Sequence, residues 1–258
     1  MIIFIIMYFR FYDSKYCHCE WSKEIQVPKA AFTLAEVLIT LTIIGIIATM
    51  TIPGLINSTN KTENVVALKK AYSTLSQATL MITADNGGDI TSALSGLIGN
   101  SDHDGFANVF IPKLNVAKNC GTTEANASGC FPNVSYNYLN GIWQNLATGA
   151  YLTSTILTND NISYAFKFWD PNCTANLANP STDTFSPLYK SVCGAIYVDI
   201  NGPNKGPTVV GRDLFQFYLA KKGIYPAGAS PSIHFDVDCS TYGFGCTSNV
   251  LLEGAMNY

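Results

Sequence analysis

The chain has 258 residues, of which 48% are hydrophobic and only 13% are charged, and its formal net charge is −3. That length and composition suit one globular domain joined to a long helix. The chain is mildly acidic and has no basic stripe, so we exclude nucleic acid as an expected partner.

An apolar segment begins after Lys29 and continues to Pro53. Its part from Phe32 to Ile52 would form a helix of roughly 31 Å, long enough to cross a hydrocarbon core. Because basic residues tend to stay in the cytoplasm, Lys29 predicts that the chain after Pro53 faces outward. The one charge in the segment, Glu36, is costly in lipid and therefore needs a partner and a role. The segment's hydroxyls are expected to bond carbonyls one turn earlier, at Thr33, Thr40, Thr42, Thr49 and Thr51.

This segment resembles the N-terminus of type IV pilins and of type II secretion pseudopilins. The matching positions are basic Lys29, small Ala31, Phe32 as first mature residue, Thr33, Leu34, Glu36 as fifth mature residue and Pro53 as twenty-second. The resemblance implies that a prepilin peptidase cuts after Ala31 and methylates the new amine of Phe32. One departure is Ala31 itself, where the family usually has glycine.

The same resemblance implies that Glu36 neutralises the methylated amine of Phe32 on a neighbouring subunit, so that two charges costly in lipid cancel. The implied partners are homologous pilin or pseudopilin subunits, the prepilin peptidase, an inner-membrane assembly platform and membrane lipid. The implied location is the bacterial inner membrane, crossed once with the N-terminus cytoplasmic, from which the subunit is extracted into a filament. A fortuitous acid in an ordinary signal anchor is the alternative.

Residues 1–31 are accordingly expected to be a leader peptide and are left out of the fold reasoning. The leaders of this family are usually short and basic, whereas these residues include an apolar patch, Ile2–Phe9. Initiation at Val27 from a GTG codon would leave the short leader Val-Pro-Lys-Ala-Ala. A long but genuine leader is the competing interpretation.

Beyond Pro53 the helix is expected to resume and to continue to residue 86. Apolar residues recur at spacings of three and four, at Val65, Leu68, Tyr72, Leu75 and the pair Leu80 and Met81. Asn86-Gly87-Gly88 is a typical helix end, because glycine readily takes the left-handed conformation. The spacing predicts one helix over 32–86, bent near Pro53. Its first half suits lipid or a filament core, and its second half suits packing on a sheet.

The remaining residues, 87–258, are expected to form an outward-facing globular head. The section from Asp89 to Pro187 is rich in Gly, Asn, Thr and Ser, which indicates loops and short elements held by disulfides, including a brief helix around Ile90–Leu97. Strands are predicted at Ile162–Trp169, Ala195–Ile200 and Leu214–Leu219. The predicted fold class is α+β: a pilin-like long helix packed on a small antiparallel sheet.

Six cysteines follow the apolar segment: Cys120, Cys130, Cys173, Cys193, Cys239 and Cys246. An even number beyond a membrane anchor indicates an oxidising compartment and disulfides. Proximity in sequence favours the pairs Cys120–Cys130, Cys173–Cys193 and Cys239–Cys246. Zinc is the rival interpretation, but His103 and His234 are far apart and no C-x2-C pair occurs among these cysteines.

The loop from Asp199 to Asp213 holds four hard oxygen ligands, on Asp199, Asn201, Asn204 and Asp213. Some major pseudopilins bind calcium in a C-terminal loop, so the resemblance makes a calcium site conceivable here. The spacing does not meet the EF-hand pattern, and a tight connection between strands needs the same residue types, so a turn is the preferred interpretation. Asp236 and Asp238 form a weaker candidate of the same type.

We find no nucleophile elbow, paired carboxylates or phosphate-binding glycine loop in a convincing context, so no catalytic residue is assigned. The sequence therefore favours a non-enzymatic filament subunit, a pseudopilin or minor pilin. A pilus tip or DNA-uptake subunit is an alternative within the family. An anchored binding module or hydrolase that uses a pilin-like export signal is the alternative from another class.

Overall fold

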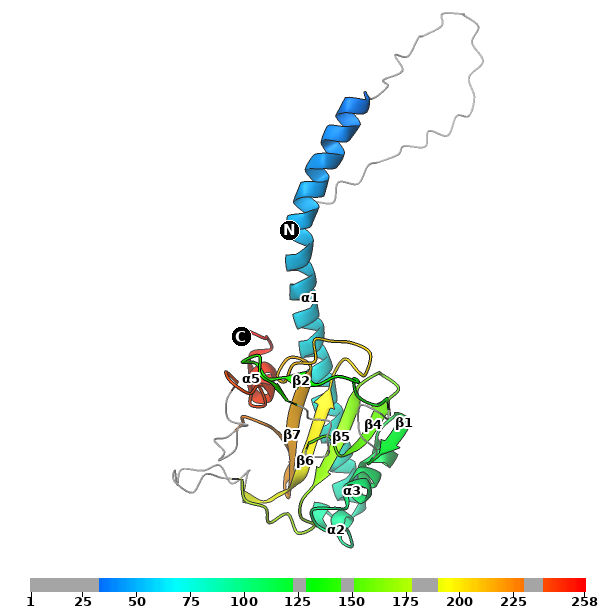
Figure 1. The fold of residues 1–258 in the computed structure, drawn as a ribbon. Coiled ribbons are helices and arrows are strands. Elements are labelled where there is room, and N and C mark those ends of the chain that lie inside the picture. The colour runs from blue at the N-terminus through cyan, green and yellow to red at the C-terminus, as the bar shows by residue number, and fades with distance from the viewer. Residues whose placement is uncertain (1–32, 123–128, 145–150, 178–189, 230–238) are drawn as a thin grey trace, which may run out of the picture. The chain divides into compact units, whose positions relative to one another are not determined.

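The computed structural model describes residues 33–122, 129–144, 151–177, 190–229 and 239–258. The chain divides into two compact units, Met1–Met50 and Thr51–Tyr258. One helix, α1 (Leu34–Asp85), contributes to both units (Figure 1). The helix continues through Pro53 without a break. The bend expected near this proline stays a prediction.

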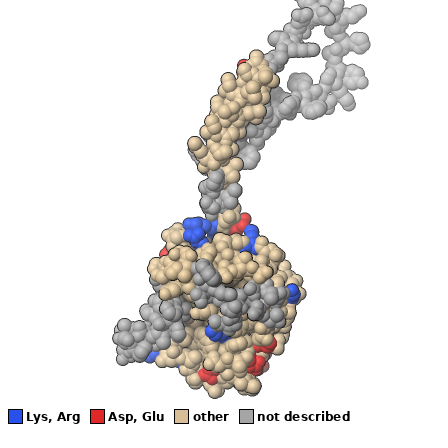
Figure 2. Space-filling view, viewed as in Figure 1, with Lys and Arg blue, Asp and Glu red and all other residues tan. Residues whose placement is uncertain are grey.

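The first part of α1 has the composition of a membrane span. Leu34–Ile52 has 19 residues, a mean hydropathy of 2.1 and no buried residue. Figure 2 shows this stretch almost entirely free of Lys and Arg, while most charged atoms lie on the head. Large apolar side chains are exposed along this stretch: Leu34 is 81% exposed and Met50 is 78% exposed. Contact of such side chains with water would be unfavourable. An apolar surrounding, lipid or other helices, is what this surface requires.

The second part of α1 belongs to the head unit and packs one stripe of side chains into its core. The buried residues of this stripe recur at helical spacing: Val65, Leu68, Ala71, Leu75, Ala78 and Ile82. Tyr72 stacks on Phe217 of the sheet with ring centroids 5.8 Å apart. The amphipathic half that the sequence predicts is therefore present, and the helix ends at Asp85, directly before Asn86-Gly87-Gly88.

Two positions assigned to the packing face were wrong. Leu80 is 69% exposed and Met81 is 43% exposed, whereas Ala78 and Ile82 are buried. From Leu75, steps of three and four residues lead to Ala78 and Ile82, and Leu80 falls on another face. Leu80 was assigned to the packing face because it is large and apolar, but the small residue Ala78 occupies that face.

The head contains a six-stranded sheet in the order β1-β4-β5-β6-β7-β8, in which every neighbouring pair is antiparallel. The strands are β1 (Val116–Gly121), β4 (Ser154–Thr158), β5 (Ser163–Phe168), β6 (Val192–Asp199), β7 (Leu214–Ala220) and β8 (Gly223–Pro226). The three strands expected from the sequence correspond to β5, β6 and β7. A separate ribbon pairs β2 (Tyr136–Asn137) with β3 (Trp143–Gln144).

Both faces of the central strands are covered. In β7, Phe215 and Phe217 belong to the core that α1 closes, while Leu214 and Tyr218 belong to a second core on the opposite face. Every residue of β6 and of β7 is buried. Successive side chains of a strand point to opposite faces. Because both faces of β6 and β7 are covered, the side chains on both faces are buried, and most of them are apolar. The α+β, pilin-like architecture that the sequence predicts is present.

Several elements of the head were not anticipated. The section expected to hold loops and short elements contains α3 (His103–Phe110), the 3₁₀ turn η1 (Ile111–Lys113) and the strands β1 and β4, whose positions were not predicted. The brief helix α2 (Ile90–Leu94) was expected, and α5 (Cys246–Glu253) was not. Phe106 and Phe110 of α3 are fully buried against Phe166 of β5. This aromatic packing, which depends on partners far along the chain, stabilises a helix of only 8 residues.

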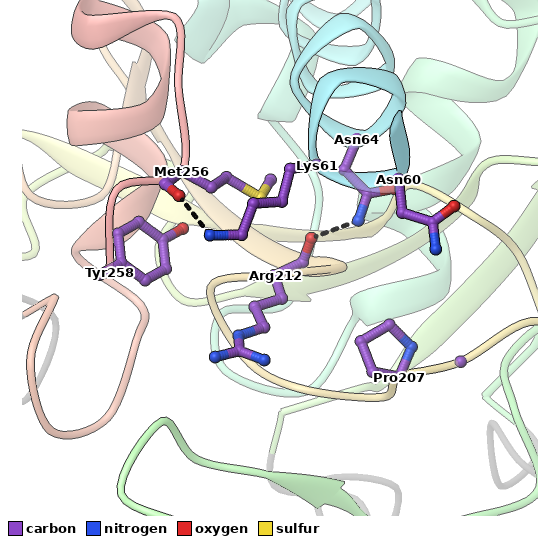
Figure 3. Close-up of a pocket in the computed structure, with 8 residues that line it drawn as sticks. Asn60, Lys61, Asn64, Pro207, Arg212, Met256 and Tyr258 are labelled. Atoms are coloured by element: carbon purple, nitrogen blue, oxygen red, sulfur yellow. Dashed lines mark hydrogen bonds between the residues drawn. The ribbon is translucent and has the colours of Figure 1, made fainter. Parts of the chain in front are cut away.

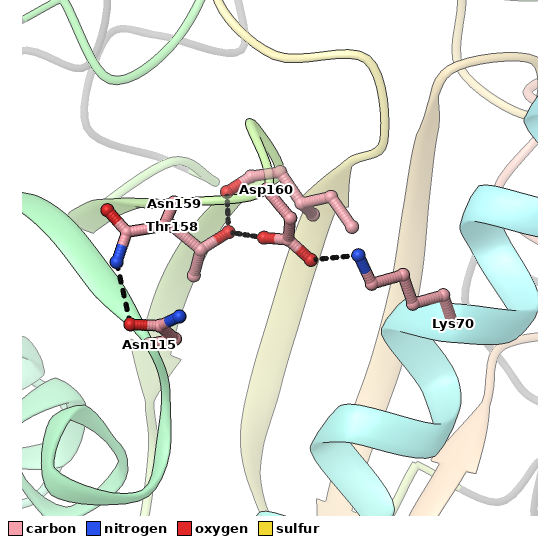
Figure 4. Close-up of polar contacts among 6 residues, drawn as sticks. Lys70, Asn115, Thr158, Asn159 and Asp160 are labelled. Carbon is pink, nitrogen blue, oxygen red and sulfur yellow. Dashed lines mark hydrogen bonds and ion pairs between the residues drawn. The ribbon is translucent and has the colours of Figure 1, made fainter.

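Polar contacts join the turn between β4 and β5 to the rest of the head (Figure 4). Lys70 of α1 forms an ion pair of 2.8 Å with Asp160, which also accepts a hydrogen bond from the Thr158 hydroxyl. The Asn159 side chain donates to that of Asn115 at 2.6 Å. Exposed ion pairs contribute little to stability, so these contacts fix the position of the turn more than they hold the head together.

The buried stripe of α1 predicts a large difference between two leucines on the same helix. Leu75→Ala should lower the free energy of unfolding of the full chain in detergent by about 2–5 kcal/mol, because it leaves a cavity in the core. Leu80→Ala is the matched control and should change it by about 0.5 kcal/mol or less. Urea unfolding followed by tryptophan fluorescence measures both. Equal losses for the two variants would contradict the packing described here.

Candidate functional site

The first residues of α1 form a reciprocal pair of hydrogen bonds. The backbone N–H of Thr33 donates to Glu36 Oε2 at 2.9 Å, and the Thr33 hydroxyl donates to the same oxygen at 2.8 Å. In return, the N–H of Glu36 donates to Thr33 Oγ1 at 3.2 Å. This is a capping box, in which a threonine before the helix and a glutamate three residues later satisfy each other's backbone donors. Glu36 therefore has a partner within its own chain.

Other hydroxyls of the apolar segment bond back to the helix. Thr40 Oγ1 donates to the carbonyl of Val37 at 3.0 Å, Thr42 Oγ1 to Leu38 at 2.7 Å and Thr49 Oγ1 to Ile46 at 2.8 Å. These bonds remove the polarity that would oppose burial in lipid. Thr33 differs from the expectation because its hydroxyl bonds Glu36. The Thr-x-x-Glu spacing was the signal in the sequence that could have predicted this pair.

Residues 28–52 match the family model described as the prokaryotic N-terminal methylation motif. The chain carries the prepilin motif of type IV pilins and pseudopilins. No curated protein and no solved structure matches the chain. The match is limited to the N-terminal segment, so the head of this pilin-like protein has to be understood from its own structure.

The residues of the predicted processing site, Lys29, Ala31 and Phe32, lie outside the described part of the chain. Among the described residues, the prepilin motif is represented by Thr33, by Glu36 and by the exposed apolar helix that follows them. Cleavage after Ala31 and methylation of Phe32 accordingly stay predictions.

Three disulfides lie in the head, and they join the cysteines that are closest in sequence. The bonded pairs are Cys120–Cys130, Cys173–Cys193 and Cys239–Cys246. Cys193 belongs to the first core, and Cys130 and Cys246 are also fully buried. Because a disulfide limits the freedom of the unfolded chain, these bridges stabilise the folded head.

The loop between β6 and β7 is organised by two buried carboxylates. Asp199 Oδ1 accepts the N–H of Asn201 at 3.1 Å and that of Gly202 at 2.9 Å, and Asp199 Oδ2 accepts the hydroxyl of Tyr136. Gly202 has a φ of 77°, and a side chain there would meet Asn161 at 2.4 Å. The turn after Asp199 therefore requires glycine at this position.

Asp213 closes the other end of the loop. Its Oδ1 accepts the N–H of Val209 at 2.6 Å, and its Oδ2 accepts that of Thr208. Burial raises the pKa of Asp213 to about 6 against the pull of these donors. Burial, together with the charge of Asp213, raises the pKa of Asp199 well above its usual range. Two acids in one buried site cannot both ionise cheaply.

This geometry supports the turn interpretation of the loop. Both carboxylates act as acceptors for the loop's own N–H groups, Asn204 is exposed, and the side-chain N–H of Asn201 donates to the carbonyl of Gly206 at 2.9 Å. Within the described residues, no group of three or more His, Cys, Asp or Glu side chains lies together. The carboxylate oxygens of Asp199 and Asp213 thus have a structural explanation, whereas Asn201 Oδ1 is buried without a hydrogen-bond partner among the described residues. Asp236 and Asp238 lie outside the described residues.

Arg212 directly precedes Asp213 in the sequence, yet its side chain is exposed and does not pair with either acid of the loop. Among the described residues, the guanidinium of Arg212 forms no ion pair, whereas its carbonyl accepts the side-chain N–H of Asn64 at 3.1 Å. Asp199 and Asp213 are buried behind their own N–H donors, while Arg212 is exposed. Sequence reasoning also missed Tyr136, because its bond to Asp199 spans 63 residues.

The buried acid pair predicts an unusual pH dependence. Because folding raises the pKa of both acids, the folded chain holds protons that the unfolded chain releases, so stability should fall as pH rises from about 4 through 6. Each unit of raised pKa corresponds to about 1.4 kcal/mol. Asp199→Asn keeps Oδ1 for the two N–H donors and cannot ionise, so it should lose less stability over this interval.

Urea unfolding of the full chain between pH 4 and 7 measures this effect, with exposed Glu253→Gln as the control. The control should follow the wild-type curve. A stability that rises with pH in the wild type and equally in Asp199→Asn would contradict the assignment of two buried acids whose pKa values are raised by folding.

Proposed function

We propose that this pilin-like protein is a structural filament subunit, a pseudopilin or minor pilin, that is cut after Ala31, methylated at Phe32 and assembled with related subunits. The observation that carries the proposal is the prepilin motif at residues 28–52, directly at the start of an exposed apolar helix. An apolar rod with a folded head can be stored in a membrane and later exchange lipid for neighbouring helices.

The capping box is compatible with processing. Cleavage after Ala31 would leave the N–H of Thr33 within the Phe32–Thr33 peptide bond, so the bonds between Thr33 and Glu36 can persist in the mature chain. Glu36 would then be held at the first turn of the helix, with its other carboxylate oxygen able to accept a hydrogen bond from a neighbouring amine. In this proposal the capping box positions Glu36, and the negative charge of Glu36 attracts the amine of Phe32 on a neighbouring subunit.

Two roles for Glu36 can be separated, because glutamine also serves in a capping box. Glu36→Gln keeps an acceptor for Thr33 and removes the charge that would neutralise the amine of Phe32. We expect membrane insertion and cleavage to be unchanged and the yield of sheared filaments to fall about tenfold or more. Immunoblots of the sheared and membrane fractions, in cells with the cognate assembly machinery, measure both quantities.

Thr33→Ala is the matched control, since it removes the hydroxyl of the box and retains the charge. It should polymerise better than Glu36→Gln. Normal filament yield from Glu36→Gln would mean that capping alone explains the acid. The intact mass of the purified wild-type protein tests processing separately, and a mature chain that begins anywhere other than N-methyl-Phe32 would overturn the proposed function.

A further inference from the structure

The head contains a cavity of about 600 Å3 with an unusual set of walls. One wall is the stretch of α1 at Asn60 and Lys61, the second is the end of the β6–β7 loop at Arg212, and the third is the C-terminal segment at Tyr258 (Figure 3). Cavities of this size are in the range that holds small ligands in other proteins. All three walls belong to the same compact unit.

Three hydrogen bonds fix these walls relative to one another. Lys61 Nζ donates to the carbonyl of Met256 at 2.9 Å, and the Asn64 side chain donates to the carbonyl of Arg212 at 3.1 Å. The Tyr258 hydroxyl donates to the carbonyl of Gly211. The cavity is therefore formed before any ligand enters, and a preformed site spares a ligand the cost of ordering it.

The charged side chains that line the cavity favour an anion. Among the described residues that line the cavity, two are cations, Lys61 and Arg212, and none is Asp or Glu. Figure 3 shows the guanidinium of Arg212 extending away from the bonds that join the walls, so its N–H groups are not used by them. The chain as a whole has a net charge of −3, so this concentration of positive charge is local.

We propose that this cavity binds a phosphate group, with the Arg212 fork as the principal donor and Lys61 as the second charge. Arginine presents paired N–H groups that match two phosphate oxygens, and lysine adds a compact charge with further donors. The proposal concerns the head alone and holds whether or not the protein polymerises.

The covalent chain makes the headgroup of an anionic lipid the first source to consider. Ile52 ends the membrane-spanning stretch, and Asn60 lines the cavity, so the two are separated by a chain that can extend about 30 Å at most. The chain thus limits how far the cavity can lie from the membrane surface, where anionic phosphates are concentrated. Free phosphate offers the same chemistry to the same donors.

The test uses the full chain in an uncharged detergent with equal amounts of phosphatidylglycerol and phosphatidylcholine. Native mass spectrometry then measures the ratio in which the two lipids are retained. Wild type should prefer phosphatidylglycerol, and Arg212→Gln should reduce this preference about fivefold. Lys222→Gln, the same loss of charge in the turn between β7 and β8, is the matched control and should not reduce it.

A second arm replaces lipid with inorganic phosphate and measures the melting temperature. A phosphate-dependent rise that Arg212→Gln abolishes, without a lipid preference, would assign the site to a soluble phosphate. Arg212→Lys retains the charge but loses the fork and should give an intermediate result in whichever arm responds, which guards against a folding defect in the glutamine variant. The proposal is overturned if neither probe is preferred or if Arg212→Gln behaves like wild type.

Discussion

The packing of the α1 stripe against the sheet is the contact on which the head depends. Small residues, Ala71 and Ala78, alternate with Leu68 and Leu75 along this stripe, and all four are fully buried. Together these alanines and leucines pack in the core between the helix and the sheet. The opposite face of the sheet is closed by a second, aromatic-rich core, so the central strands are enclosed on both sides.

The same helix carries the feature that connects this protein to pilins. In the part of α1 from Leu34 to Ile52, apolar residues occur on every face and none is buried. In the part of α1 that belongs to the head, the buried apolar residues lie along one stripe. A helix that is apolar all round suits lipid or a bundle of like helices, and an amphipathic helix suits one folded domain. The Thr33–Glu36 capping box stabilises the start of this helix. It gives hydrogen-bond partners to backbone N–H groups that have none within the helix.

The β6–β7 loop shows how buried polar groups can build a surface site. Asp199 and Asp213 are wholly buried and hold the two ends of the loop through backbone N–H groups. With both acids turned inward, Arg212 is left on the outside without an acidic partner among the described residues. Contacts from Asn64 and Tyr258 then bring α1 and the C-terminal segment beside it. Because the acids of the loop are buried and Arg212 is exposed, the charge that the loop contributes to the cavity is positive.

Features that depend on neighbours close along the chain could be predicted from the sequence. The apolar length of the span, the prepilin motif, the helix end before Gly87 and the strands with strong apolar runs can all be predicted because period and spacing are local properties. The pairing of cysteines by proximity belongs to the same class, since all three pairs close short loops.

Features that join distant parts of the chain depend on the folded structure. The short helix α3 exists because Phe106 and Phe110 are buried against β5. The bond of Tyr136 to Asp199 and the meeting of Lys61 with Arg212 have no local pattern. Their energies arise from burial and charge in three dimensions, which spacing along a sequence does not encode.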